Sequence, residues 1–320
     1  MISRRQSLAL AGAAALANNN ASAAPATAPT VKTLVNFKIP PGACDCHVHV
    51  FPDPAKFPFW SSRGYTPPIA TAADLLALQH ALHMDRVVIV TPSVYGTDNR
   101  ATLDGIKQLG FARARGVAVI GPDTTKAQMA AMDKAGVRGI RVNLESNGVT
   151  DPAAAAKNLE AAIAQLAGTK WHMQMYARLS VIAALADRIA KMPMHPVFDH
   201  FAGAKADQGV NQQGFDLVLA MVRSGKAYVK ISGAYRASTA APDFANVAPL
   251  AKALIAANPD RIIWGSDWPH PGPAAKTPMD INTPFPVDDG RVLNLLAEWE
   301  PNPTIRQKIL VTNPARLYGF

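Results

Sequence analysis

The fold begins at residues 43–50, which read Ala-Cys-Asp-Cys-His-Val-His-Val. Apolar and polar residues alternate here, and the following Phe-Pro-Asp-Pro ends the pattern at once, which predicts a β-strand. Residues two apart in a strand point to the same side, so His47 and His49 leave the strand end as a pair of imidazoles directed at one point. Such a pair can hold a metal ion or polarise a substrate.

The rest of the chain alternates between apolar strand candidates and helical segments. The further strands are predicted at residues 86–90, 115–120, 139–143, 171–176, 196–199, 227–231 and 261–264. Helices are predicted at residues 73–82, 99–109, 125–135, 152–167, 180–191, 214–224, 247–257 and 291–299. Eight such units predict a single-domain α/β protein with a closed (β/α)8 TIM barrel, and an open doubly wound sheet is the alternative.

Polar side chains gather at the ends of the predicted strands, and the starts carry few of them. These polar residues are His47, His49, Ser93, Arg141, Asn143, Tyr176, His200, Ser232 and Asp267. In a barrel the strand ends form one mouth, where catalytic residues lie. The Pro- and aromatic-rich residues 56–69 are too long for a plain connection, so we expect this loop to close over the mouth.

Two further stretches carry chemistry. Residues 264–271, Trp-Gly-Ser-Asp-Trp-Pro-His-Pro, hold Asp267 rigidly at a strand end, where a carboxylate can take a proton from water or bind a metal. An Asp in this place can also cap a helix, but the two prolines delay any helix. His200 ends the sixth strand. Arg141 alternates with Val142 inside an apolar strand, so its charge requires a buried partner.

Composition and charge narrow the class of partner. The 320 residues are 49% hydrophobic and 17% charged, as in a soluble globular protein. The net charge of +9 is scattered, without the basic block or aromatic-interleaved helix typical of nucleic-acid binding, and favours small anionic substrates. The only cysteines, Cys44 and Cys46, are too close along a strand for a disulfide, so we expect free thiols in the core.

The N-terminus has the layout of an export signal. Arg4 and Arg5 precede an Ala-rich apolar run and a small-residue cleavage sequence at residues 21–23, which predicts a twin-arginine-like signal peptide over residues 1–23 and a periplasmic location. A disordered tail on a cytoplasmic protein is the alternative. The run is too short to span a membrane, so no membrane association of the mature form is expected. Residues 24–37 are predicted to be a flexible linker, and residues 38–320 the barrel.

The combination of these motifs resembles the amidohydrolase superfamily, and within it the lactonase branch that includes 2-pyrone-4,6-dicarboxylate lactonase, sugar-lactone and sulfomuconolactone enzymes. The resemblance rests on residues 45–51, on Asp199-His200 and on residues 265–271, together with Tyr65-Thr66-Pro67, residues 95–100 and residues 313–318. It covers the chain from Pro40 to Tyr318 and implies a (β/α)8 barrel that hydrolyses a lactone bearing carboxylates.

The resemblance also implies roles for individual residues. Asp267 would activate the hydrolytic water, and His47, His49 and His200 would polarise or hold the lactone carbonyl. The acid groups of the substrate would be bound by Tyr65, Ser93, Arg141, Tyr176 and Arg236. Metal-dependent members of the superfamily usually carry a Lys or Glu after strand four and a His after strand five, but Arg141/Asn143 and Gln174/Tyr176 stand here. We therefore expect no required cofactor; the alternative is one Zn²⁺ on His47, His49 and Asp267, with His200 a further possible ligand.

Three functions follow from these residues. The leading one is hydrolysis of a small carboxylated lactone. The same barrel could instead run a lactone isomerisation or a metal-dependent decarboxylation. The third is an exported protein that binds carboxylated ligands without turnover, although a pure anion binder gains nothing from a central carboxylate such as Asp267. The lactone itself and the oligomeric state are left open.

Overall fold

The computed structural model describes residues 31–320. The predicted export signal and the first residues of the predicted linker lie outside this part of the chain. The strands are β1 (Cys44–Val48), β2 (Arg86–Val90), β3 (Ala114–Ala118), β4 (Val137–Asn143), β5 (His172–Tyr176), β6 (Pro196–Phe198), β7 (Tyr228–Ser232) and β8 (Ile262–Gly265). They pair in the order β1 to β8, and every pair is parallel.

The barrel closes where the chain after β8 meets β1. The Asp267 amide donates to the His47 carbonyl and the His49 amide to the Trp268 carbonyl, both at 2.8 Å. A Cβ on Gly265 would lie 2.8 Å from the His47 nitrogen, so only glycine allows this approach. The closed barrel is therefore confirmed, and the open doubly wound sheet is wrong.

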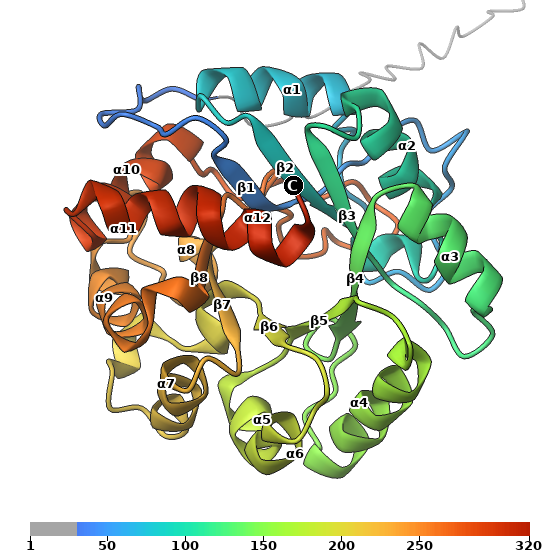
Figure 1. Cartoon of the computed structure of the whole chain (residues 1–320). Coiled ribbons are helices and arrows are strands. Elements are labelled where there is room, and N and C mark those ends of the chain that lie inside the picture. Colours follow the sequence, from blue (N-terminus) through green and yellow to red (C-terminus); the bar gives the residue numbers. More distant parts are fainter. Residues whose placement is uncertain (1–30) are drawn as a thin grey trace, which may run out of the picture.

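Helices surround the strands as a ring (Figure 1). They are α1 (Ala72–Ala81), α2 (Arg100–Leu109), α3 (Lys126–Lys134), α4 (Pro152–Leu166), α5 (Leu179–Ala184), α6 (Ala186–Ala190), α7 (Phe215–Arg223), α8 (Ala234–Ala237), α9 (Ala248–Ala257), α10 (Asp289–Trp299), α11 (Pro303–Gln307) and α12 (Asn313–Tyr318). Local signals start several of them: Thr71 and Thr125 form capping boxes, and Asp151 caps α4 ahead of Pro152. The predicted helix at 180–191 divides into α5 and α6 at Leu185.

An irregularity in β1 allows its cysteines and its histidines to point into the same barrel interior. The β1–β2 register shifts between Asp45 and Val48. Cys44 and Cys46 are buried free thiols that pack with Val88 and Val117, as expected for core cysteines. After the shift, His47 and His49 also turn inward, where they meet Lys230 of β7 and Asp267 after β8. Strict alternation would have placed the cysteines and the histidines on opposite faces.

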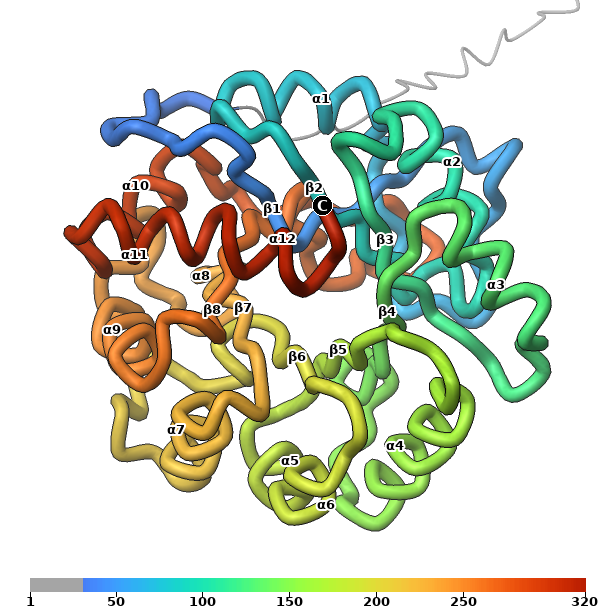
Figure 2. The backbone as a smooth tube through the Cα atoms, viewed as in Figure 1, coloured from blue at the N-terminus to red at the C-terminus, as the bar shows by residue number. Residues whose placement is uncertain are grey.

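The two ends of the barrel are closed by different segments. At the start of the strands, α12 crosses the opening (Figures 1 and 2). Its Tyr318 ring lies 5.2 Å from the His172 ring. At the other end the loops 51–70 and 266–288 meet, because Thr66 Oγ1 donates to the Pro278 carbonyl at 2.7 Å and the Asn282 amide to the Thr66 carbonyl at 2.8 Å. The first loop therefore lies at the mouth, where its Trp60 and Tyr65 line a cavity.

The last residues of the predicted linker are packed. The backbone amides of Lys32 and Thr33 donate to the Asp288 carboxylate before α10, and the Asn36 amide donates to Asn294 Oδ1 at 2.8 Å. Val31, Val35 and Phe37 contact the core. Residues 31–37 therefore form part of the barrel's outer wall. Among the described residues, no helix has the length and apolar character needed to cross a membrane.

Candidate active site

The predicted mouth residues come together at the ends of the strands. His47 and His49 arrive at the end of β1, His200 follows β6, and Asp267 follows β8; all four are buried. Their backbone is unusual, because Asp267 has φ +65° and His200 has φ +47°. Non-glycine residues rarely adopt this left-handed conformation, and such strain concentrates at functional sites.

Asp267 lies at the centre of this group. Its Oδ2 accepts hydrogen bonds from the Tyr235 hydroxyl at 2.6 Å and from Arg236 Nε at 2.5 Å. Its Oδ1 has no hydrogen-bond donor among the described residues, although His49 Nε2 lies 3.5 Å away and His47 Nε2 lies 3.6 Å away. Oδ1 is thus the oxygen left open for a water molecule, a substrate proton or a cation.

The neighbours of the two β1 histidines constrain their tautomers. His49 Nδ1 lies 2.7 Å from the Val90 carbonyl, which can only accept, so the hydrogen is on Nδ1 and the lone pair on Nε2 faces Asp267. His47 Nδ1 lies between two opposed partners: Asp199 Oδ1 at 3.2 Å, which accepts, and Lys230 Nζ at 3.3 Å, which donates. Whichever partner engages Nδ1 decides whether His47 Nε2 presents a hydrogen or a lone pair.

Asp199 and Lys230 form a charged layer beneath the histidines. Asp199 Oδ2 accepts from Arg141 Nε and from Gln174 Nε2, each at 3.0 Å. Lys230 Nζ donates to Gln174 Oε1 at 2.6 Å and lies 3.5 Å from Asp199 Oδ1. Arg141 therefore has the buried partner that its position required, and this expectation is confirmed.

Burial and neighbouring charges set the ionisation of the site. Burial alone would raise the pKa of Asp267, but Arg236, His200 and His49 hold it well below its usual range. Burial lowers the pKa of His47 and His49, and lowers the pKa of His200 to about 3. At neutral pH the centre therefore consists of an ionised carboxylate among neutral imidazoles.

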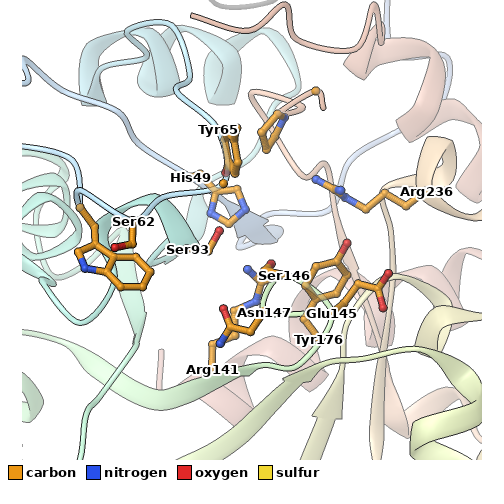
Figure 3. A pocket seen from close by; sticks show the side chains of 14 residues that line it. His49, Ser62, Tyr65, Ser93, Arg141, Glu145, Ser146, Asn147, Tyr176 and Arg236 are labelled. Carbon is orange, nitrogen blue, oxygen red and sulfur yellow. The ribbon is translucent and has the colours of Figure 1, made fainter. Parts of the chain in front are cut away.

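A cavity of about 580 Å³ opens above this centre (Figure 3). All five residues predicted to bind acid groups line it: Tyr65, Ser93, Arg141, Tyr176 and Arg236. The Tyr176 ring lies between the two guanidiniums, with its centroid 4.7 Å from Arg141 Cζ and 5.9 Å from Arg236 Cζ. Each guanidinium uses Nε for a buried aspartate and donates no other hydrogen bond to a described residue, so its Nη groups remain available to an anion.

The comparisons with known proteins show the family of the chain. The sequence profile of the family described as Amidohydrolase matches residues 44–320. The chain belongs to this family. It is 34% identical over 290 residues to the 4-sulfomuconolactone hydrolase of Hydrogenophaga intermedia, which covers 89% of this chain and 91% of that protein.

Two other relatives of this amidohydrolase are named for a pyrone dicarboxylate and for a lactone. The 2-pyrone-4,6-dicarboxylate hydrolase of Comamonas testosteroni is 34% identical over 292 residues, covering 88% of this chain and 92% of the relative. The D-galactarolactone isomerase of Agrobacterium fabrum is 27% identical over 290 residues, covering 89% and 94%. The resemblance drawn from the motifs is confirmed at the level of the family.

Sequence reasoning missed two residues of this amidohydrolase's site, Lys230 and Tyr235. Lys230 is the only charged residue in the apolar strand Tyr-Val-Lys-Ile-Ser, where it is fully buried. The argument that identified Arg141, a charge inside an apolar strand, applies to it equally. Tyr235 precedes Arg236 on the short helix α8. No sequence signal shows that its hydroxyl reaches Asp267, because that depends on how the chain turns after β7.

Proposed function

We propose that this protein hydrolyses a lactone that carries carboxylates, with Asp267 activating the water. The observation that carries the proposal is the open Oδ1 of a fully buried, ionised Asp267, which lies below a cavity with two available guanidiniums. Two relatives at 34% identity that are named as hydrolases of a lactone and of a pyrone dicarboxylate support it. Both names describe compounds with a cyclic ester and acidic groups.

The reaction can be followed atom by atom from these side chains. A water molecule at Asp267 Oδ1 gives its proton to the carboxylate while its oxygen adds to the lactone carbonyl carbon. The ring C–O bond then breaks, and the proton on Asp267 passes to the departing ring oxygen. An Nε2–H of His47 or His200 can donate to the carbonyl oxygen as negative charge develops there. For His200 this requires the Ser232 hydroxyl, 3.0 Å away, to donate to Nδ1.

Arg236 links substrate binding to the strength of the base. While its Nε stays on Asp267, the low pKa of the carboxyl makes it a weak base. If the guanidinium turns toward a substrate carboxylate, Asp267 loses its strongest opposing charge, so its pKa rises and proton abstraction becomes easier. A lactone without an acid group would leave the base in its weak state, so this coupling would favour carboxylated substrates.

The residues also fit one divalent ion. His49 Nε2 and Asp267 Oδ1 both present lone pairs, and His47 Nε2 does so when its Nδ1–H faces Asp199; these ligand atoms lie within 4.8 Å of one another. Zn²⁺ accepts such a set, and when bound it would polarise the carbonyl or the attacking water. Donation from Lys230 to His47 Nδ1 favours the other tautomer. Independence from a cofactor stays a prediction.

Isomerisation is the second candidate, because a lactone isomerase is among the relatives. Asp267 could move a ring or hydroxyl proton without adding water. Decarboxylation and simple ligand binding have no comparable support. The distinction lies in the product: hydrolysis consumes one water and releases one acidic proton, whereas isomerisation releases none.

A screen of carboxylated lactones with a pH indicator, run with and without chelator, tests the proposal. We expect proton release with at least one five- or six-membered carboxylated lactone and an open-chain hydroxy acid as the product in NMR spectra. Activity that survives exhaustive chelation supports cofactor independence, and activity restored by added Zn²⁺ supports the single-metal alternative. Conversion without proton release would favour the isomerase, and binding without conversion would contradict both.

We propose further that the protein is exported to the periplasm through its paired arginines. The support is the sequence of residues 1–23 alone. Fractionation of cells that make the full chain, followed by N-terminal sequencing, tests it. A mature protein that begins near Ala24 in the periplasmic fraction is the expected result, and an uncleaved cytoplasmic chain would contradict it.

A further inference from the structure

A second, larger cavity adjoins the candidate active site. It has a volume of about 970 Å³, against about 580 Å³ for the first. The two cavities share Trp60, Ser93, Arg141 and Asn147 as lining residues, so they lie on either side of the same side chains. We call the second cavity the annex. Figure 3 shows Ser93, Asn147 and Arg141 on the side of the first cavity away from Arg236, so the annex extends from that side.

The annex has a different character from the first cavity. Its wall is formed by Pro58 and Trp60 of the first loop, the chain after β2, the chain after β3, the end of β4 and one face of α4. Its apolar lining includes Val119, Ile120, Val142, Leu144, Ala161 and Ala162. Apart from Arg141 at the shared boundary, its only charged lining residue is Asp98, which is already paired with Arg100 at 2.6 Å. Its lining also holds neutral polar side chains, namely Thr97, Asn143, Asn147, Asn158 and Gln165. The annex is therefore unsuited to a second carboxylate and suited to a group that is mainly apolar.

One buried polar atom in the annex lacks a partner. Asn143 is 7% exposed, lines the annex and not the first cavity, and its Oδ1 has no hydrogen-bond donor among the described residues. A buried acceptor without a donor costs roughly 1–3 kcal/mol, so it points to a ligand or water that supplies one. Asn143 is two residues beyond Arg141 on β4, so a donor there would lie close to the boundary of the two cavities.

A small ring does not need the volume of the annex in order to bind. A cavity of about 580 Å³ already lies within the ~300–1,000 Å³ typical of small-molecule sites. A lactone with its carboxylates on Arg141 and Arg236 can therefore be held in the first cavity. The annex is additional volume that adjoins the first cavity at their four shared lining residues.

We propose that the annex binds an apolar arm of the substrate. The preferred substrate is then a carboxylated lactone with an alkyl or aryl substituent of several carbons, which carries a hydroxyl near its root for Asn143. This inference rests on the proposed function, because the ring and its carboxylates must occupy the first cavity for the arm to reach the annex. It narrows the proposed substrate class from a ring that carries only carboxylates to a ring that also carries an apolar substituent.

The test measures binding of two open-chain hydroxy diacids, the product type, by calorimetry. One carries a phenylpropyl arm and the other has none. We expect the armed diacid to bind the wild-type protein at least tenfold more tightly, because the annex removes the apolar surface of the arm from water. Ala161→Phe, on the exposed edge of α4, should remove most of this advantage and leave the armless diacid unaffected. Ala162→Leu fills the annex from its buried side and should act likewise.

Ala164→Phe is the matched control, because Ala164 is an exposed alanine of the same helix that lines neither cavity. Circular dichroism confirms folding of each variant. An arm that gives no gain in the wild-type protein, or equal effects of Ala161→Phe and Ala164→Phe, would overturn the inference while the armless diacid still binds as the proposed function requires. Failure of both diacids to bind would contradict the proposed function, and the arm with it.

Discussion

The two ends of this barrel contain the same kinds of buried side chain in opposite settings. At the mouth, His47, His49 and His200 surround the ionised Asp267, and a charged layer with Lys230 lies beneath them. At the floor, His172 is equally buried but faces the Tyr318 ring and has no hydrogen-bond partner on either nitrogen among the described residues. Burial is thus common to histidines at both ends, whereas an ionised carboxylate and an adjoining cavity lie beside the mouth histidines. This difference is why we propose a role in the reaction for the mouth histidines.

The largest effect is expected from removal of the mouth carboxylate. Asp267→Asn leaves a side chain of the same shape that cannot accept the proton of water, so kcat/KM should fall about 10³-fold in the hydrolysis assay. Binding of a product diacid should persist. Asp133→Asn is the control at the floor, where the amide oxygen can still accept from Trp171 Nε1, and it should keep full activity. Undiminished turnover in Asp267→Asn would remove the basis of the proposed mechanism.

Lys230→Met tests the charged layer beneath the histidines. It leaves the buried Asp199 with fewer cations, and breaking a buried pair in this way costs roughly 3 kcal/mol in the free energy of unfolding. Turnover should fall as well, because His47 loses the donor on Nδ1. Lys226→Met is the control, since Lys226 is partly exposed near the floor and donates to the Met192 carbonyl. Urea unfolding measures the free energy of unfolding of both variants. Equal values for the two would show that Lys230 does not stabilise the fold through the charged layer.

The floor histidine should appear in the pH dependence of stability. Burial lowers the pKa of His172 to about 3, so between that value and about 6.5 the unfolded chain binds a proton that the native state does not. Stability is therefore lost as pH falls through this window, by roughly 2 kcal/mol at pH 5 for this one group. His172→Leu should remove that share of the slope and leave turnover unchanged. An unaltered slope in urea titrations at pH 5 and 8 would refute the assignment.

The smallest effect is expected from a Tyr→Phe substitution, which can be made once at each end of the barrel. Tyr235→Phe removes a hydroxyl that donates to Asp267 Oδ2 and helps to hold the carboxylate in its orientation; this loss of orientation should outweigh the gain in basicity, so kcat/KM should fall roughly tenfold. Tyr318→Phe removes a buried hydroxyl without a partner among the described residues, and activity should change less than about twofold. Equal losses would mean that the two ends are functionally coupled.

Much of the fold was predictable because it depends on local patterns. Continuous apolar strands, helical segments between them and capping residues such as Thr71 and Asp151 are written in short windows of sequence, and the predicted strands correspond to β1–β8. Asp267 and His200 were predictable because strand ends of a barrel must meet at one mouth. The packing of residues 31–37 against α10 depends on contacts with residues about 255 positions away, so local patterns did not indicate it.

The sequence by itself determined the eight strand–helix units, the polar residues of the mouth and the family motifs, because each depends on residue type and spacing along the chain. Only the tertiary structure decided the pairings that set the chemistry. Arg236 pairs with Asp267 and Arg141 with Asp199, Lys230 reaches His47, and an apolar annex opens beside the site. These contacts join residues up to 183 positions apart, as for His47 and Lys230, and their geometry is fixed by barrel closure and the β1 register shift rather than by any local preference.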